Sequence, residues 1–228
     1  EHGYEIVSFE ERADVYLINT CSVTNMADRK SRQMLHRARK QNPEALIIAA
    51  GCYVQAAGEE LLKDPAVDIL IGNNEKAGLS KILREWEESR RAFYVHDMSH
   101  ERQYEELNHS RTAGHTRAFV KIQDGCDQFC AYCIIPYTRG RVRSRSLSDI
   151  LSEVKALSEN GYQEAVLTGI HLDSYGTDLE GCSLLDVIRA VADVDGIRRI
   201  RLGSLEPRIM TDEFVHGLAE VEKLCPHF

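Results

Sequence analysis

The stretch Gly125-Cys126-Asp127-Gln128-Phe129-Cys130-Ala131-Tyr132-Cys133 places three cysteines at spacings of four and three residues. It follows directly on a short apolar run, 117–123, which is typical of a buried β-strand. A loop with this spacing can wrap three thiolates around one iron–sulfur cube and leave the fourth iron open to another ligand. Three alternatives remain at this point: a structural zinc site with a distant fourth ligand, an electron-transfer cluster with a fourth cysteine, and thiols that bind no metal.

The segments after this loop alternate between short apolar runs and amphipathic stretches, which predicts an α/β unit. Ser146, with Asp149 three residues later, is a capping signal for the first helix of this unit. We expect residues 117–228 to form part of a (β/α) barrel, the remainder of which lies beyond this chain. The expected strands are 117–123, 164–168 and 198–202, and the expected helices are 147–160, 183–194 and 211–222.

The N-terminal part of the chain shows the same alternation and predicts a doubly wound parallel sheet. Its apolar strands lack a polar face, which indicates that helices cover both faces of the sheet. We expect this domain over residues 1–95, with its start missing, followed by an exposed polar linker over 96–116. The expected strands are 13–19, 45–50 and 66–71, and the expected helices are 26–41, 53–63 and 75–88.

Two more cysteines end strands of this first unit. Cys21 follows Asn19-Thr20, and Cys52 follows Gly51. Parallel pairing would bring both thiols to the carboxyl edge of the sheet, where open α/β sheets bind their ligands. The alternative is that both cysteines are small buried residues of the core.

Composition and charge limit the class of protein. The seven cysteines are odd in number and clustered, which favours metal binding in a reducing, cytoplasmic compartment over disulfides. No run of 18 apolar residues is present, so no membrane span is expected. The net charge of −8 argues against a nucleic-acid partner, although phosphate binding needs only a local basic strip.

Such a strip is predicted beside the cysteine loop. Four arginines alternate along one segment, and in an extended chain all four side chains would point to one face. That face would suit the phosphates of RNA; the alternative is that the arginines pair with acidic surface groups. The four are Arg139, Arg141, Arg143 and Arg145.

The pattern Cys126-x-x-x-Cys130-x-Tyr132-Cys133 resembles the motif of radical S-adenosylmethionine (SAM) enzymes. The flanking stretches 119–126 and 134–145 resemble the methylthiotransferase branch of that superfamily, and 19–33 and 167–176 resemble the group acting on threonylcarbamoyladenosine. The resemblance implies an enzyme that adds a methylthio group to C2 of N6-threonylcarbamoyladenosine next to the tRNA anticodon. Isopentenyladenosine in tRNA and a ribosomal-protein aspartate are the alternative substrates, and a non-catalytic iron–sulfur or zinc module is the alternative class.

The resemblance also implies cofactors and partners. Cys126, Cys130 and Cys133 would bind a 4Fe–4S cluster whose open iron chelates SAM, with Tyr132 against the adenine of SAM. A second 4Fe–4S cluster would use Cys21, Cys52 and a third cysteine before Glu1. The implied partners are tRNA and an electron donor such as flavodoxin or ferredoxin, and the protein is expected to be a monomer. Because the cofactor performs the difficult chemistry, no catalytic residue is expected beyond the cluster ligands.

Two further SAM contacts are expected on loops that follow predicted strands. Gly169 follows strand 164–168 and would let the backbone approach the cofactor, or it is only part of a strand-to-helix turn. Glu206 follows strand 198–202 and would bond a hydroxyl or amine of SAM, or it pairs with Arg208.

Overall fold

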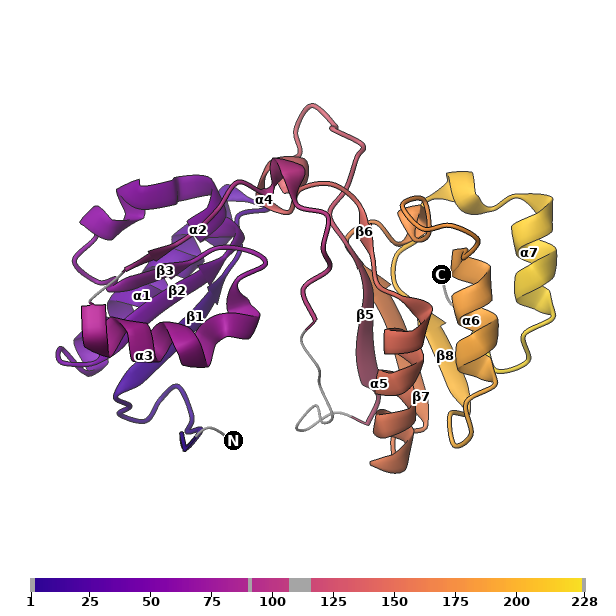
Figure 1. Ribbon diagram of the computed structural model, residues 1–228, viewed down its shortest axis with the longest axis horizontal. Coiled ribbons are helices and arrows are strands. Elements are labelled where there is room, and N and C mark those ends of the chain that lie inside the picture. The colour runs from indigo at the N-terminus through magenta and orange to yellow at the C-terminus, as the bar shows by residue number, and fades with distance from the viewer. Residues whose placement is uncertain (1–2, 90–91, 107–115, 227–228) are drawn as a thin grey trace. The chain divides into compact units, whose positions relative to one another are not determined.

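The computed structural model describes residues 3–89, 92–106 and 116–226 of the 228-residue chain. The chain forms two compact units, which we describe separately. The first unit consists of Glu1–Glu101 and Phe129–Gly140, and the second of Arg102–Gln128 and Arg141–Phe228. Each unit is an α/β structure built on a four-stranded sheet, in agreement with the predicted fold class (Figure 1). No helix in the described ranges is both long and apolar enough to cross a membrane.

The sheet of the first unit is parallel throughout, with strand order β1-β2-β3-β4. Its first three strands were predicted, whereas the fourth, two residues long, gave no signal in the sequence. The strands are β1 (Val15–Thr20), β2 (Leu46–Gly51), β3 (Ile69–Ile71) and β4 (Phe93–Tyr94). The helices are α1 (Asn25–Gln41), α2 (Cys52–Ala57), α3 (Leu79–Ser89) and α4 (Ile135–Thr138), with short 3-10 helices η1 (Gly58–Lys63), η2 (Lys76–Gly78) and η3 (Met98–His100).

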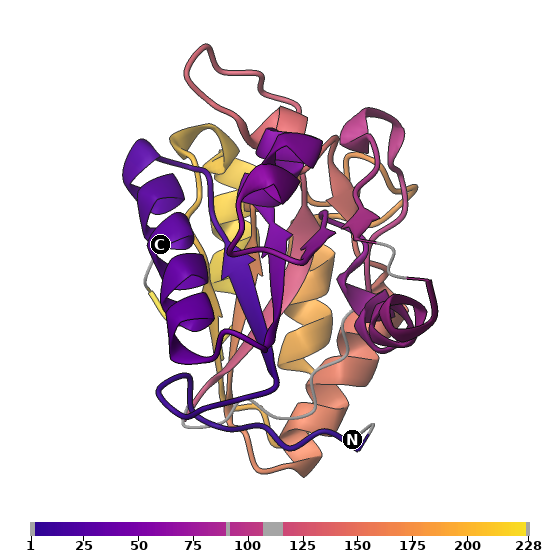
Figure 2. The same cartoon turned by 90° about the vertical axis from the view of Figure 1, so that its left-hand side faces the viewer.

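Helices cover both faces of this sheet, as the apolar strands predicted. Successive residues of β2 point to opposite faces. Ile47 packs in one core with Leu35 of α1 and Val54 of α2, whereas Ile48 packs in a second core with Ile82 of α3. Figure 2 shows α1 and α3 on opposite sides of the strands. The first unit is therefore doubly wound.

The second unit has strand order β6-β5-β7-β8, in which only β6 is antiparallel to its neighbour. Helices α5, α6 and α7 pack on one face of the parallel strands around a single core. The strands are β5 (Ala118–Asp124), β6 (Arg143–Ser144), β7 (Glu164–Gly169) and β8 (Arg199–Leu202). The helices are α5 (Leu147–Glu159), α6 (Leu184–Ala192) and α7 (Asp212–Ala219), with 3-10 helices η4 (Leu172–Ser174) and η5 (Pro207–Ile209).

The segment expected to be an exposed linker is partly built into the units. Met98 is fully buried, and the Tyr104 hydroxyl donates a hydrogen bond to the Lys121 carbonyl oxygen at 2.8 Å. Part of the expected linker, 107–115, lies outside the described residues. The polar composition of 96–116 therefore did not reveal that its first half supplies buried side chains.

Candidate functional site

The carboxyl edge of the first sheet carries two thiols. The last paired residues of β1 and β2 are Thr20 and Gly51, so Cys21 and Cys52 follow at the same level of the sheet. The two strand ends approach closely, because a Cβ at Gly51 would lie 2.7 Å from the Thr20 carbonyl oxygen, and Gly51 has a φ of +103°. The backbone amide of Cys21 donates to the Ser31 hydroxyl of α1 at 3.3 Å. The position expected from the sequence is therefore the position found.

The two thiols have different surroundings. Cys21 is exposed, whereas Cys52 is buried. The Arg139 Nε donates to the Cys52 sulfur at 3.0 Å, and the Asn73 amide nitrogen lies 3.6 Å from the same atom. The Asn73 amide is held in place because it also donates to the Thr138 carbonyl oxygen at 2.7 Å. Such N–H donors stabilise negative charge on sulfur, which is the form that binds iron.

The three-cysteine loop begins where β5 ends. Gly125 has a φ of +72° and Phe129 a φ of +47°, so the backbone bends sharply on both sides of the segment 126–128, which contains the buried Cys126. The Cys133 amide donates to the Cys130 carbonyl oxygen at 2.9 Å, which closes a tight turn. None of the seven cysteines, all of which lie in the described part of the chain, forms a disulfide. The residues present thus fit a group that takes thiolate ligands.

Tyr132, the residue expected to lie against the adenine of SAM, is open to solvent, with 92% of its surface exposed. Its ring is available to lie against a flat partner such as a purine. The neighbouring aromatic residues behave differently, since Phe129 and Tyr137 pack edge to face with ring centres 5.7 Å apart.

In the second unit, polar side chains gather on the loops after β7 and β8. His171 Nε2 lies 3.2 Å from a carboxylate oxygen of Glu206, and the Glu206 amide donates to the Asp173 carboxylate at 2.8 Å. The Arg208 guanidinium donates to Glu206 at 2.7 Å, and this bond lowers the pKa of the Glu206 carboxyl, with a smaller contribution from His171. Glu206 therefore pairs with Arg208, which was one of the two alternatives expected from the sequence. Its lowered pKa keeps the carboxylate charged.

Sequence reasoning missed His171 and Asp173. The signal was available, because both polar residues come directly after the buried strand 164–169, at the edge where parallel strands place functional groups. Their ligand atoms and that of Glu206 all lie within 4.8 Å of one another.

Gly169 has a role that neither expectation named. A Cβ at this position would lie 2.8 Å from the side-chain oxygen of Gln123 and 3.0 Å from the Gln123 Cβ. The glycine is thus required for the close packing of β7 against Gln123 of β5.

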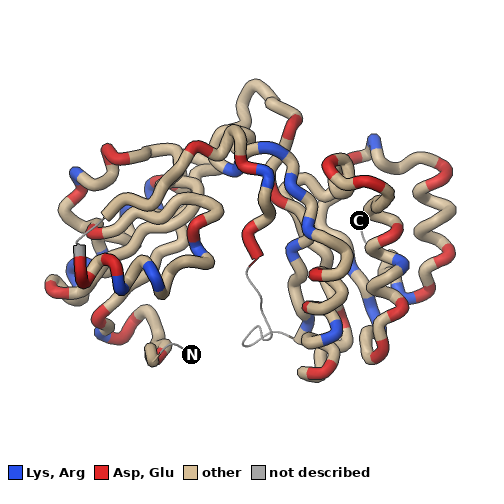
Figure 3. The backbone as a smooth tube through the Cα atoms, viewed as in Figure 1, with Lys and Arg blue, Asp and Glu red and all other residues tan. Residues whose placement is uncertain are grey.

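The four alternating arginines do not form one exposed strip. The side chains of Arg143 and Arg145 are only 1% and 3% exposed. Arg145 pairs with Glu106 at 2.6 Å and also with Glu153, and Arg143 lies 3.5 Å from Asp124. The predicted geometry is wrong for these two residues because carboxylates of their own unit bury and neutralise them. Along the rest of the chain, acidic and basic residues are interspersed (Figure 3).

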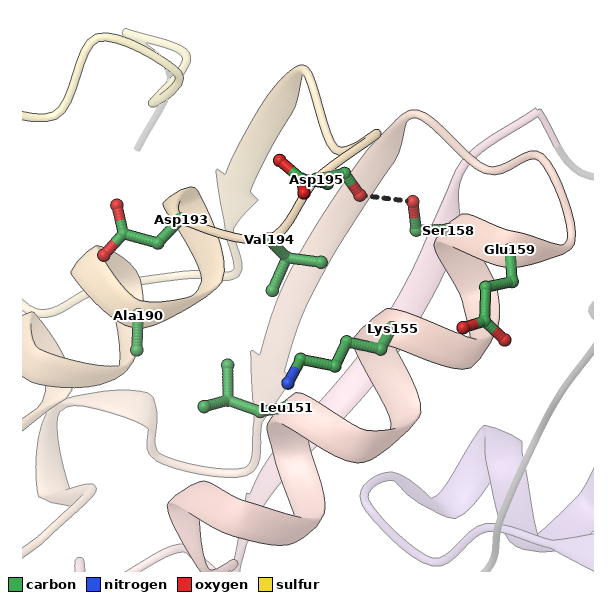
Figure 4. A pocket seen from close by; sticks show the side chains of 8 residues that line it. All are labelled: Leu151, Lys155, Ser158, Glu159, Ala190, Asp193, Val194 and Asp195. Atoms are coloured by element: carbon green, nitrogen blue, oxygen red, sulfur yellow. Dashed lines mark hydrogen bonds between the residues drawn. The ribbon is translucent and has the colours of Figure 1, made fainter.

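A groove of about 490 Å³ lies between α5 and α6 on the outside of the second unit. Figure 4 shows Leu151 and Lys155 of α5 beside it, and the bond from the Ser158 hydroxyl to the Asp195 carbonyl oxygen at 2.6 Å. Ser158 and Asp195 precede β7 and β8, so this groove is at the amino ends of the strands. It is separate from the polar loops at their carboxyl ends.

Two family descriptions match this chain. Residues 1–72 match the "Uncharacterized protein family UPF0004", and residues 120–225 match the "Radical SAM superfamily". The first matched region contains strands β1, β2 and β3, and the second contains the three-cysteine loop and the strands β6, β7 and β8.

Several curated relatives align along the whole chain. A threonylcarbamoyladenosine tRNA methylthiotransferase MtaB of Aquifex aeolicus is 42% identical over 100% of this chain and 56% of the relative. The enzyme of the same name from Bacillus subtilis is 40% identical over 100% of this chain and 51% of the relative. A tRNA-2-methylthio-N(6)-dimethylallyladenosine synthase of Geobacter sulfurreducens is 37% identical over 100% of this chain and 52% of the relative. The chain therefore spans about half the length of these relatives.

Solved structures share the fold at low identity. The radical SAM methyltransferase TsrM of Kitasatospora setae, with cobalamin and a [4Fe-4S] cluster bound, has a TM-score of 0.63 at 15% identity. The match covers 92% of this chain and 48% of that protein. At this identity the likeness concerns the three-dimensional fold.

Proposed function

We propose that this chain, which is similar along its whole length to radical SAM methylthiotransferases, takes part in adding a methylthio group to C2 of N6-threonylcarbamoyladenosine in tRNA. The modified nucleoside would lie next to the anticodon. Two relatives at 42% and 40% identity carry the threonylcarbamoyladenosine name, which supports this substrate. The relative at 37% identity supports a second candidate, dimethylallyladenosine (isopentenyladenosine) in tRNA.

The observation that carries the proposal is the loop at the end of β5. Cys126, Cys130 and Cys133 would supply three thiolates to a 4Fe–4S cluster. One iron of the cluster would then keep a coordination position open for SAM. When bound, the cluster and SAM supply the one-electron chemistry that breaks an unactivated C–H bond. The chain itself binds and orients these groups. Tyr132 offers an open aromatic face for adenine, and the charged Glu206 suits an ammonium or hydroxyl donor of SAM.

A second 4Fe–4S cluster is proposed at the edge of the first sheet. Cys21 and Cys52 provide two of its ligands, and the N–H groups of Arg139 and Asn73 are directed at the sulfur of Cys52. Hydrogen bonds to a ligating sulfur stabilise its negative charge and influence the potential of a cluster. Arg139 is therefore proposed to donate a hydrogen bond to this sulfur and not to contact RNA.

The proposed partners are tRNA and an electron donor such as flavodoxin or ferredoxin, and the protein is proposed to act as a monomer in the cytoplasm. Seven cysteines that form no disulfide fit a reducing compartment. Of the four arginines first considered for RNA, Arg141 retains a 42% exposed side chain, so it is the one proposed to meet phosphate.

The test is anaerobic reconstitution with iron and sulfide, followed by electron paramagnetic resonance (EPR) of the reduced protein with and without SAM. We expect a 4Fe–4S signal that changes on addition of SAM, and loss of this change in Cys130→Ala. Incubation with tRNA that carries threonylcarbamoyladenosine or dimethylallyladenosine then separates the two substrates. Zinc without iron, or a cluster indifferent to SAM, would instead support a non-catalytic metal module.

A further inference from the structure

Gln123 occupies an unusual position near the end of β5. Its side chain is fully buried, although most glutamines in proteins are exposed. The pairing of β5 with β7 shifts register between Lys121 and Gln123, so that Gln123 is opposite Gly169. Such an irregularity redirects a side chain at the end of a strand. Here the side chain comes to lie where the strand is followed by the loop that carries Cys126.

The amide of Gln123 has all its hydrogen-bonding groups occupied. Its nitrogen donates to the carbonyl oxygens of Asp124 at 2.9 Å and Gly125 at 2.8 Å, and its oxygen accepts from the His171 amide at 2.8 Å. An amide group offers two donor hydrogens, and both are used here. One side chain thus joins the loop after β5 to the loop after β7.

The fit around this amide leaves little freedom. As described above, a Cβ at Gly169 would lie 2.8 Å from the Gln123 side-chain oxygen. The neighbouring Asp124 carboxylate accepts from the Gly125 amide at 2.9 Å, which fixes the residue immediately before Cys126. A buried amide that is bonded through its nitrogen and its oxygen in this way makes one arrangement of the two loops rigid.

The same network continues to the third loop. His171, whose amide Gln123 holds, places its ring nitrogen 3.2 Å from Glu206, and Asp173 accepts from the Glu206 amide. The loops after β5, β7 and β8 are therefore connected through Gln123, His171 and Asp173. These loops meet at the carboxyl edge of one sheet, where ligands bind in such folds.

We propose that Gln123 is a positioning residue that fixes the His171–Glu206 loops relative to the loop carrying Cys126, and thereby sets the affinity for SAM. This inference rests on the proposed function. Gln123 would contact neither SAM nor iron and would act through the backbone of Gly125 and His171.

The experiment compares two variants of the full chain. Gln123→Glu keeps the shape and the acceptor for the His171 amide but loses the nitrogen that donates to the two carbonyls. Gln123→Met removes donors and acceptor together. We expect both variants to take up iron as the wild type does, since the three cysteines are intact. We expect the SAM concentration that half-completes the EPR change to rise about tenfold or more, because buried carbonyl oxygens and the His171 amide lose their partners.

Ser158→Ala is the matched control. It also removes a hydrogen bond between two segments, from Ser158 in the last turn of α5 to Asp195 in the loop before β8, but at the amino ends of the strands (Figure 4). We expect a lower melting temperature with unchanged SAM affinity. If Ser158→Ala weakens SAM binding as much as the Gln123 variants, or if both Gln123 variants bind iron and SAM as the wild type does, the inference is overturned.

A measurement without any variant or cofactor separates this inference from the proposed function. The His171 amide should exchange slowly with deuterium in the wild-type protein, because it is bonded to a buried acceptor. Fast exchange at His171 contradicts the role of Gln123 even if the cluster binds SAM. Slow exchange together with a cluster indifferent to SAM would leave Gln123 as a loop anchor and reject both the proposed function and the effect on SAM.

Discussion

The two ends of the segment 139–145 show how differently one sequence pattern is used in the two units. Arg139, in the first unit, donates its Nε to the sulfur of Cys52. Arg145, in the second unit, is buried between Glu106 and Glu153. The alternating arginines look equivalent in the sequence, but one guanidinium faces a thiol and the other neutralises two carboxylates. The partner of each arginine, and not its spacing in the sequence, therefore decides what its charge does.

The largest effect is expected at the buried end of the segment. Arg145→Met leaves Glu106 and the 5% exposed side chain of Glu153 without their cation. An uncompensated buried charge costs about 3–5 kcal/mol. We therefore expect the unfolding free energy of the second unit to fall by about this amount in urea, followed by circular dichroism.

The double variant Arg145→Met with Glu153→Leu sharpens this result. Replacing both partners of a buried pair by apolar residues is often nearly neutral, so much of the lost stability should return. The recovery of stability will be incomplete, because Glu106, whose side chain is 36% exposed, still lacks its partner Arg145. A single variant as stable as the wild type would show that the arginine is not buried between carboxylates in solution.

The extent to which the sequence determined these features differs between backbone and side chains. Periodicity predicted the long strands and helices, because their apolar residues must face a core. The two-residue strands β4 and β6 were missed, because two residues are too few to show an alternation of apolar and polar side chains. The positions of Cys21 and Cys52 followed from strand ends alone. The partners of Gln123, Arg143 and Arg145 did not, because they come from other elements of the second unit: a loop, a strand and a helix.

A smaller effect is expected at Arg139. Arg139→Met removes the donor 3.0 Å from the Cys52 sulfur, and Asn73 remains beside that atom. We expect a loss of about 1.5–3 kcal/mol in the stability of the first unit, typical of one hydrogen bond with a charged group. The affinity for tRNA should not change, as measured by fluorescence anisotropy. A variant with normal stability but weaker tRNA binding would return Arg139 to the RNA-binding strip.

The smallest effect on stability is expected at Arg141, and it is the one arginine at which RNA affinity should change. Its guanidinium lies 3.5 Å from Asp127, with side chains 42% and 51% exposed, and such surface pairs contribute about 0–1 kcal/mol. Arg141→Ala should therefore unfold almost as the wild type does. If Arg141 meets a phosphate, tRNA affinity will fall and the slope of log K against log salt will decrease by about 1.

Lys155→Ala supplies the comparison for that measurement, because Lys155 is an exposed cation beside the groove at the amino ends of the strands. It changes the net charge by the same amount as Arg141→Ala, so an effect of overall charge would appear equally in both variants. A smaller slope in Arg141→Ala alone would locate the phosphate contact near the cysteine loop. Equal slopes in Arg141→Ala, Lys155→Ala and the wild type would mean that none of the four arginines forms an RNA-binding strip, and that acidic partners account for the exposed one as well.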